Sequence, residues 1–571
     1  MAQAGRYYEQ ANPDLLTRIP VTATAVLEIG CGAGALGDAY KAINPTATYI
    51  GVELMPGPAE QARKVLDYVI EGDISELKVL GLPKKINKID CLIFGDVLEH
   101  LVDPQKVIKM LLPLLKEEGQ LIACIPNAQH WSLITNLLHG KWPQEDQGLF
   151  DRTHLRWFTR EGIISLLQSL DLYIQDIKPR IFRPERAKAF VSALSPSLGS
   201  LSIDPQNLFD GVAPLQYVVR AGKQKVNPIQ ICGLMLSPQA GMNDVRMIQP
   251  LRSIGSFPGV RVSMAPEKLQ VPVTTSETAK IMIWQRQLLT YERSLDDIRR
   301  IIKAGYILIS EFDDDPNHWP AIAKNKNLNF TGTHAVQVST TELSKTISRY
   351  NPNVEVFENC LERVPNVSTN KWCGAGHTKP LKIFFGALNR EDDWSRWITP
   401  LNNFLAQNIQ RWEFEIVHDI NFYEALHTSS KHFTPTCNYT EYLAKMQECH
   451  IALLPLNNTS FNNKKSDLKF VEAAGCNVAC IASPTVYENT IIHNETGMIC
   501  SDPLKLPEIL EEWQNNPSHA EKLAKSAQNW CIKNRLQNQQ SIRRLAWYQS
   551  LWRRRDELTK ELFKRVPELN I

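Results

Sequence analysis

The sequence of 571 residues lacks an excess of charge of either sign, because 63 Lys and Arg stand against 61 Asp and Glu. No field of the whole chain would attract nucleic acid or an anionic membrane, and we expect no nucleic-acid partner. The sequence also lacks any run approaching the ~20 apolar residues that cross a bilayer. Its start, MAQAGRYYEQ, has no apolar core after basic residues, which argues against a secretion signal there. These absences predict a cytoplasmic protein.

The 12 cysteines form neither a C-x-x-C pair nor a dense framework. The closest pair, Cys476 and Cys480, lies within an apolar segment. This usage is typical of buried, reduced thiols in a reducing compartment.

The chain is too long for one hydrophobic core, so several compact units are expected. Short apolar runs alternate with segments of helical period, which predicts an α/β fold with largely parallel sheets. Polar stretches at Gly222–Asn227 and Thr369–Thr378 interrupt this alternation. We therefore predict domains over residues 1–222, 228–372 and 380–535, followed by a helical tail over residues 536–571.

The apolar runs of the first domain predict strands at Ala25–Ile29, Tyr49–Glu53, Tyr68–Glu71, Cys91–Phe94 and Leu121–Ile125, and two late edge strands at Tyr173–Ile177 and Gln216–Arg220. Between the late strands, the Pro-, Ser- and Arg-rich segment Arg180–Pro214 predicts an inserted lid or loop. Further strands are predicted at Ile229–Leu236, Ile281–Trp284, Tyr306–Glu311, Ala335–Ser339, Leu381–Gly386, Glu413–His418, Ile451–Pro455 and Val478–Ala482.

A nucleoside-binding pattern opens the first domain. The segment Glu28–Gly34 carries an apolar strand into three glycines at alternate positions, which lets the backbone turn tightly and approach a ligand. Glu53 ends the second strand, where a carboxylate can accept both ribose hydroxyls. Asp73 and Ile74 follow the third strand and could bracket an adenine ring.

This ordered series resembles the class I S-adenosylmethionine-dependent methyltransferases, through E-x-G-x-G-x-G, Glu53, Gly72-Asp73 and the segment Asp90–Leu101. The resemblance covers residues 1–222 and implies a Rossmann-like fold with S-adenosylmethionine as cofactor. The binding residues that it implies are Glu28, Gly30, Gly32, Gly34, Glu53, Asp73, Ile74 and Asp96.

Two segments are candidates for the site of the methyl acceptor. Asp96–His100 follows the fourth strand, and Phe150–Thr159 combines a histidine, two arginines and aromatic residues in a predicted loop. His154 could take a hydroxyl proton, which favours O-methylation, although a structural hydrogen bond explains it equally well.

Asp96, Glu99, His100 and His154 could hold a divalent metal, as in RNA 2′-O-methyltransferases with a similar pattern. Helix capping and a supporting role explain Glu99 and His100 equally, and we predict no metal.

A second site is indicated in the segment Lys464–Val478. Lys464, Lys465 and Lys469 accompany a predicted helix N-terminus, which is a natural diphosphate site. Glu472 lies one turn into that helix, where ribose or sugar hydroxyls would lie.

The segment resembles the donor-binding domain of family 4-like GT-B glycosyltransferases, whose motif ends in E-A-x-x-x-G-x-P-V. The turn Phe385–Arg390 extends the resemblance, with Arg390 as a phosphate-binding residue. It implies a two-domain GT-B unit, twin Rossmann-like in fold, with a nucleotide-sugar as co-substrate. The sequence departs from the motif twice: Lys464 replaces the usual Glu eight residues before Glu472, and Asn477 replaces the usual Pro.

The acidic segment Glu311–Asp315 offers a competing interpretation, because an Asp-x-Asp after a strand is how GT-A transferases hold a metal. A complete α/β domain follows it, and acids before a proline commonly form a capped turn. We interpret it as a loop lining the cleft.

Together these patterns predict a bifunctional methyltransferase and glycosyltransferase of glycan or cell-surface polysaccharide synthesis. The acceptor would be a small molecule or glycan, which could be lipid-linked. Two alternatives stay open: a methyltransferase with a degenerate glycan-binding module, and a natural-product tailoring enzyme. Arg543, Arg544, Arg553, Arg554 and Arg555 gather on a predicted terminal helix, where peripheral membrane contact is a secondary interpretation.

Overall fold

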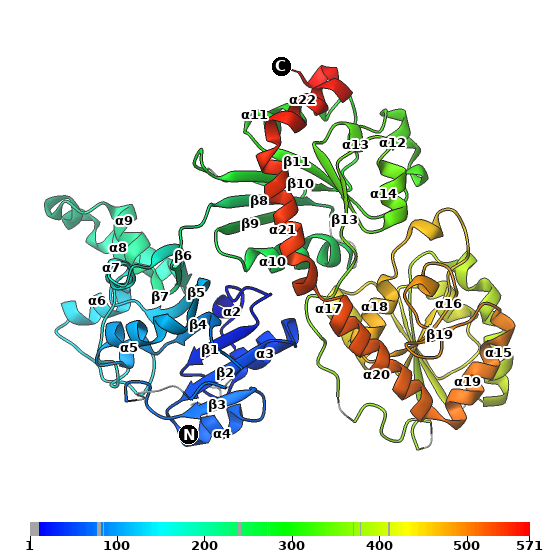
Figure 1. Cartoon of the computed structure of the whole chain (residues 1–571), viewed down its shortest axis with the longest axis horizontal. Coiled ribbons are helices and arrows are strands. Elements are labelled where there is room, and N and C mark those ends of the chain that lie inside the picture. The colour runs from blue at the N-terminus through cyan, green and yellow to red at the C-terminus, as the bar shows by residue number, and fades with distance from the viewer. Residues whose placement is uncertain are drawn as a thin grey trace. The chain divides into compact units, whose positions relative to one another are not determined.

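The computed structural model describes residues 11–76, 81–83, 85–237, 241–270, 272, 274–368, 370–376, 378–408 and 411–570 (Figure 1). The chain divides into two compact units. The first contains the residues up to Asn227 together with Gly255–Val260, and the second contains Pro228–Ile254 and the residues from Arg261 onward. Both are α/β, so the predicted fold class is confirmed.

The first unit contains a seven-stranded sheet of order β3-β2-β1-β4-β5-β7-β6. Its strands are β1 (Ala25–Ile29), β2 (Thr48–Glu53), β3 (Tyr68–Glu71), β4 (Ile89–Gly95), β5 (Leu115–Pro126), β6 (Tyr173–Ile181) and β7 (Pro214–Gly222). The strands from β3 to β5 run parallel, whereas β7 is antiparallel to both of its neighbours. Two late edge strands were predicted. Of these, β6 does lie at an edge of the sheet, but β7 lies inside it between β5 and β6, so that half of the prediction is wrong. Most of β7 is buried, as an interior strand requires.

Helices connect these strands. They are α2 (Pro13–Leu16), α3 (Ala35–Ile43), α4 (Pro56–Ala62), α5 (Pro104–Leu111), α6 (Trp131–Leu138), α7 (Arg160–Gln168), α8 (Pro184–Leu198) and α9 (Pro205–Val212). Strand β1 is buried over its whole length, as expected of a parallel strand covered on both faces. Because β1 and β2 pair in parallel with Ile29 opposite Val52, the glycine turn and Glu53 emerge at the same edge of the sheet.

The prediction of a lid or loop over Arg180–Pro214 is wrong, because this segment contains the helices α8 and α9. Pro184 and Pro205 occupy the first helical turn, where the missing N–H costs no hydrogen bond. Asp204 caps α9 by accepting the Asn207 N–H at 2.8 Å. The two helices share a small apolar core that includes Ala187 and Val212.

The second unit contains two six-stranded sheets, of order β13-β12-β11-β10-β8-β9 and β16-β15-β14-β17-β18-β19. The first is formed by β8 (Ile229–Met235), β9 (Val260–Pro266), β10 (Ala279–Gln285), β11 (Ile307–Phe312), β12 (Ala335–Val338) and β13 (Val354–Val356). The second is formed by β14 (Leu381–Gly386), β15 (Trp412–Val417), β16 (Lys431–Thr434), β17 (Ile451–Leu454), β18 (Ala479–Ala482) and β19 (Met498–Ile499). The central strands of both sheets run parallel, which gives the predicted twin arrangement.

The longer helices of this unit are α10 (Gln249–Gly255), α11 (Leu295–Lys303), α14 (Thr341–Ile347), α15 (Glu391–Asn408), α16 (Ile420–Ala425), α17 (Tyr439–Gln447), α18 (Leu468–Gly475), α19 (Leu506–Asn515), α20 (Pro517–Asn534), α21 (Gln537–Arg553) and α22 (Arg555–Arg565). The short helices α12 (Pro320–Lys324) and α13 (Leu328–Thr331) lie between β11 and β12. In Figure 1, α20 runs along the second sheet and α21 continues onto the first.

The terminal helices α21 and α22 pack on the first sheet of this unit. The Tyr548 hydroxyl donates to Gln337 Oε1 at 2.7 Å, and Leu562 joins the apolar cluster beside β10 and β11. Arg544 is buried and Arg543 pairs with Glu355, so the expected basic face is divided between the core and the surface. Among the residues that the structure describes, no helix is both long and apolar enough to cross a membrane.

Candidate functional sites

The three glycines after β1 adopt the left-handed conformation that glycine permits. Their φ angles are +72° at Gly30, +54° at Gly32 and +85° at Gly34. A Cβ atom at Gly30 would lie 2.4 Å from Val97 Cγ2, and one at Gly34 would lie 2.8 Å from Val65 Cγ2. The turn is therefore packed against the protein, and its amides are bonded within it: Gly30 N–H to the Val52 carbonyl, Gly34 N–H to the Cys31 carbonyl and Gly32 N–H to Glu53. What the glycines offer a ligand is a backbone without side chains, which allows a close approach.

Glu53 is held beside this turn. Its Oε2 accepts the Gly32 N–H at 2.8 Å and its Oε1 accepts the Met55 N–H at 2.9 Å. A carboxylate offers about four lone-pair positions, so each oxygen retains capacity for a hydroxyl donor. The carboxylate is thus fixed in orientation at the carboxyl end of β2.

The remaining candidates for cofactor binding have different surroundings. Glu28 is 5% exposed and accepts the Tyr49 hydroxyl at 3.0 Å; burial raises its pKa to about 8, so it belongs to the core. Asp73 accepts the Ser75 N–H at 2.8 Å after β3, and Ile74 beside it is buried. Asp96 follows β4 with a φ of +53° and accepts from Gln216 Nε2 at 2.6 Å.

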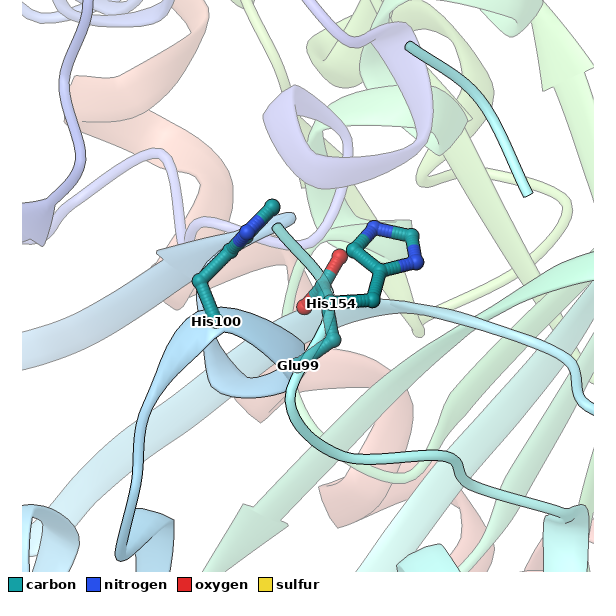
Figure 2. Close-up of side chains that lie close together, drawn as sticks. All are labelled: Glu99, His100 and His154. Carbon is teal, nitrogen blue, oxygen red and sulfur yellow. The ribbon is translucent and has the colours of Figure 1, made fainter. Parts of the chain in front are cut away.

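A second group of polar side chains lies where β4 ends. Figure 2 shows Glu99, His100 and His154 drawn together, the first two from the short helical turn Leu98–His100 and the third from the loop that precedes α7. One ligand atom from each residue lies within 4.8 Å of the others. His100 Nδ1 lies 2.9 Å from the Thr153 hydroxyl oxygen, which orients that ring.

Glu99 is the unusual member of this group. Its side chain is 1% exposed, and neither carboxylate oxygen has a hydrogen-bond partner among the described residues. Burial, followed by the charge of Asp96, raises the pKa of Glu99 well above its ordinary value. A carboxylate and two imidazoles are ligands that a divalent metal accepts, so these residues fit a cation.

The loop that carries His154 also presents aromatic residues. The Trp157 ring lies 5.6 Å from His154 and 4.8 Å from Trp142, and both tryptophans are partly exposed. Sequence reasoning missed Trp142, which has no motif around it.

The second unit contains a cavity of about 360 Å³ lined by residues that follow strands of both sheets. Four predicted donor-binding residues line it: Arg390, Lys465, Lys469 and Glu472. Arg390 donates to Asp393 at 3.0 Å, and Lys469 donates to the Tyr442 hydroxyl at 2.7 Å. Glu472 is 2% exposed; burial raises its pKa and the charge of Lys469 opposes that shift.

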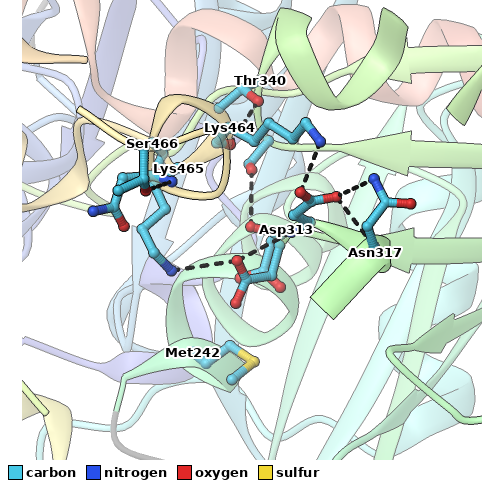
Figure 3. Close-up of polar contacts among 12 residues, drawn as sticks. Met242, Asp313, Asn317, Thr340, Lys464, Lys465 and Ser466 are labelled. Atoms are coloured by element: carbon cyan, nitrogen blue, oxygen red, sulfur yellow. Dashed lines mark hydrogen bonds and ion pairs between the residues drawn. The ribbon is translucent and has the colours of Figure 1, made fainter. Parts of the chain in front are cut away.

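Lys464, the fifth predicted donor-binding residue, has contacts that differ from those of the other four. It is not among the residues that line the cavity, and its Nζ instead contacts Asp315 Oδ2 at 2.7 Å (Figure 3). Lys465 makes a weaker contact with Asp314 Oδ1 at 3.3 Å. The acidic segment after β11 is therefore the partner of both lysines, and Asp313 and Asp314 line the cavity as predicted for a cleft loop.

The second departure from the motif has a backbone explanation. Asn477 has a φ of +54°, which proline cannot adopt and asparagine tolerates. The turn after α18 therefore requires a residue other than proline here.

Other lining residues escaped sequence reasoning. They are His418, Tyr439 and Tyr442. Arg246 pairs with Glu311 at 2.7 Å although 65 residues separate them, so only the folded structure reveals this buried pair.

Two family models match separate parts of the chain. A family model described as a methyltransferase domain matches residues 4–177, and one described as glycosyl transferase-like matches residues 395–546. The chain joins a methyltransferase domain to a glycosyltransferase domain.

Curated relatives match about a fifth of the chain. A ubiquinone biosynthesis O-methyltransferase of Actinobacillus pleuropneumoniae is 33% identical over 106 residues, covering 17% of this chain and 43% of the relative. A 37.1 kDa protein in a transposon of Streptomyces fradiae is 29% identical over 133 residues, covering 23% of this chain and 37% of the relative. The chain thus spans about two fifths of the length of these relatives.

Some solved structures are similar to parts of the chain. HepE of Anabaena in complex with UDP-glucose is 14% identical, with a TM-score of 0.39, over 56% of this chain and 99% of that one. A possible histamine N-methyltransferase of Thermotoga maritima is 18% identical, with a TM-score of 0.27, over 39% of this chain and 96% of that one.

Proposed function

We propose that the first unit transfers a methyl group from S-adenosylmethionine to a hydroxyl, and that the second transfers a sugar from a nucleotide-sugar. Both activities would act on one glycan, because a single chain that carries both can extend a glycan and methylate it. The observation that carries the proposal for the first unit is the buried, unpartnered carboxylate of Glu99 beside two histidines.

The cofactor-binding residues fit S-adenosylmethionine. The glycine turn would lie against its methionine part, Glu53 would accept hydrogen bonds from its ribose, and Asp73 with Ile74 would lie near its adenine. When bound, the cofactor supplies an electrophilic methyl group. The role proposed for Glu28 is structural, since its carboxyl group is occupied by Tyr49.

For the acceptor, we propose a divalent cation held by Glu99, His100 and His154, in place of the metal-free site predicted from sequence. A cation would remove the cost of an unpaired buried carboxylate, about 1–3 kcal/mol. It would also lower the pKa of an acceptor hydroxyl. Trp142 and Trp157 offer apolar ring faces beside this site, on which a sugar ring can pack.

Replacing Glu99 with glutamine tests the cation. Titration of the full-length protein with MnCl2 in a calorimeter should show one site, and Glu99→Gln should weaken its affinity at least ~10-fold, since supporting residues alone change metal affinity by that factor. Glu161→Gln, on the exposed end of α7, is the matched control and should bind Mn²⁺ normally. Equal binding by Glu99→Gln and the unsubstituted protein would refute the cation site.

The pH dependence of methyl transfer tests His154. Burial, and then the charge of His100, hold the pKa of His154 below its ordinary value of 6.5. The neutral imidazole, which can accept a proton or bind a cation, is therefore present at pH 7 and is lost only as the pH falls through the lowered pKa. We expect protonation of His154 to lower kcat/KM only below pH 6.5. A fall that begins above pH 6.5 and persists in Glu99→Gln would contradict this assignment, because Glu99, whose pKa is raised, is then removed as its source.

The proposal for the second unit rests on the charges in its cavity. Arg390, Lys465 and Lys469 can stabilise a departing nucleotide diphosphate, and Glu472 can accept sugar or ribose hydroxyls. Hydrolysis of ADP-, GDP- and UDP-sugars by the full-length protein tests this activity. Turnover of none of them would favour the alternative of a glycan-binding module without activity.

Neither a lipid-linked acceptor nor membrane contact is part of the proposal. Of the five arginines predicted to gather on a terminal helix, Arg544 is buried and Arg543 is paired with Glu355, while Arg553, Arg554 and Arg555 are exposed. Acceptor preference would separate the two remaining interpretations. Methylation of oligosaccharides indicates glycan synthesis, whereas methylation confined to glycosylated small molecules indicates tailoring.

A further inference from the structure

Buried polar side chains line the cavity of the second unit. Arg246 Nη2 has no hydrogen-bond partner among the residues that the structure describes, and Tyr439 and Glu472 lie against each other in the same lining, with Lys469 3.7 Å from Glu472 Oε2. An unpaired buried polar atom costs about 1–3 kcal/mol, so a ligand with several donors and acceptors would be stabilised here. Sugar hydroxyls supply both.

The acidic turn Asp313–Asp315, which follows β11, faces the loop before α18 that carries Lys464 and Lys465. Figure 3 shows Lys464 and Lys465 reaching toward this turn, with dashed lines marking the contacts to Asp315 and Asp314. Asp315 is almost fully engaged, because its Oδ1 also accepts the Asn317 N–H at 3.1 Å. Thr340 strengthens the connection by donating to the Lys464 carbonyl at 3.0 Å.

Asp313 is the member of the turn that these contacts leave available. Its Oδ1 lies 3.4 Å from Arg286 Nη1, a long contact, and no hydrogen bond to its Oδ2 occurs within the described part of the chain. Arg286 is itself positioned over the Trp319 ring at 4.7 Å. Asp313 therefore has a fixed direction and a free acceptor oxygen, and it lines the cavity.

Position 464 cannot accept a hydrogen bond, because an ammonium group has donors only and this one is bound to Asp315. The segment Lys464–Val478 therefore lacks a carboxylate at position 464, where the GT-B motif that it resembles has a glutamate. We propose that Asp313 supplies this carboxylate from the opposite domain, by accepting a hydroxyl of the transferred sugar. The inference rests on the glycosyl transfer proposed above.

The pairs Lys464–Asp315 and Lys465–Asp314 then have a positioning role. They join the acidic turn to the loop before α18. With the diphosphate of the nucleotide-sugar near Lys469 and Arg390, the sugar at the far end of the diphosphate would then reach Asp313. The ligand class is a nucleotide-sugar with a free hydroxyl, and Asp313 contributes to the choice of sugar and not to the binding of the nucleotide.

The test compares Asp313→Asn with the unsubstituted full-length protein. The probe is the member of a panel of ADP-, GDP- and UDP-sugars that the unsubstituted protein hydrolyses fastest, together with its nucleoside diphosphate. Asp313→Asn should lower the affinity for the nucleotide-sugar ~10-fold or more, from the loss of a hydrogen bond to a charged group, and leave the affinity for the diphosphate within about twofold. Asp313→Glu, which keeps the carboxylate, should retain sugar-dependent affinity.

Asp297→Asn, on the exposed face of α11, is the matched control for the lost charge and should change neither affinity. If Asp313→Asn binds the nucleotide-sugar as tightly as the unsubstituted protein does, Asp313 has no role in sugar binding while the proposed transferase activity stands. If the diphosphate affinity falls equally, the residue supports the nucleotide site and the inference is wrong. If the unsubstituted protein hydrolyses no nucleotide-sugar, the proposed function and this inference both fail.

Discussion

Replacing Gly32 with arginine is expected to abolish binding of S-adenosylmethionine. Gly32 lies at the middle of the turn with a φ of +54°, and its amide is bonded to Glu53. A long cationic side chain here would enter the space beside the turn, compete for the Glu53 carboxylate and keep the sulfonium group away. Calorimetric titration with S-adenosylmethionine should show no binding, and methyl transfer should fall below detection.

The matched control for this substitution is Gly140→Arg. Gly140 also has a positive φ, of +67°, but a Cβ atom there would meet nothing within 4 Å. Both variants carry the same charge and a similar backbone cost, of about 1 kcal/mol, so only the position differs. Gly140→Arg should bind the cofactor normally. Retained binding by Gly32→Arg would show that the cofactor does not lie against this turn.

The central strands could be predicted because burial dictates their composition. Strands β1 and β14 have the predicted bounds, Ala25–Ile29 and Leu381–Gly386, since both are apolar runs next to a turn. In the second unit, the strands β9, β13, β16 and β19 were missed, and all four lie at sheet edges. Edge strands are short and partly exposed, so their sequences carry little of the apolar signal.

The candidate sites could be predicted where their residues lie close together in the sequence. The glycine turn and Glu53 are visible because a strand, a turn and the next strand fix their spacing. Nothing local indicates that Lys464 contacts Asp315, because 149 residues separate them and the contact depends on how two domains face each other. For the same reason, the isolation of the Glu99 carboxylate appears only when the loop around His154 is folded over it.

Replacing Lys469 with methionine is expected to remove glycosyl transfer while leaving methyl transfer unchanged. Lys469 lines the cavity, and its ammonium group lies 2.7 Å from the Tyr442 hydroxyl oxygen and 3.7 Å from Glu472. Methionine keeps an unbranched apolar stem against the Tyr442 ring but offers no charge to a departing diphosphate. Loss of one such stabilising group should reduce turnover of the nucleotide-sugar about 10²–10³-fold.

The fold should tolerate this change because Glu472 can become neutral. Burial already raises the pKa of Glu472, and Lys469 opposes that shift, so removing the lysine raises the pKa further and favours the protonated form. Lys525→Met, on the exposed face of α20, removes a surface pair with Glu521 and is the matched control. It should keep both activities, and both variants should show the cooperative thermal unfolding of the unsubstituted protein. Because the two reactions are assigned to separate compact units, a parallel loss of methyl transfer in Lys469→Met would contradict two independent sites and would require a shared acceptor site instead.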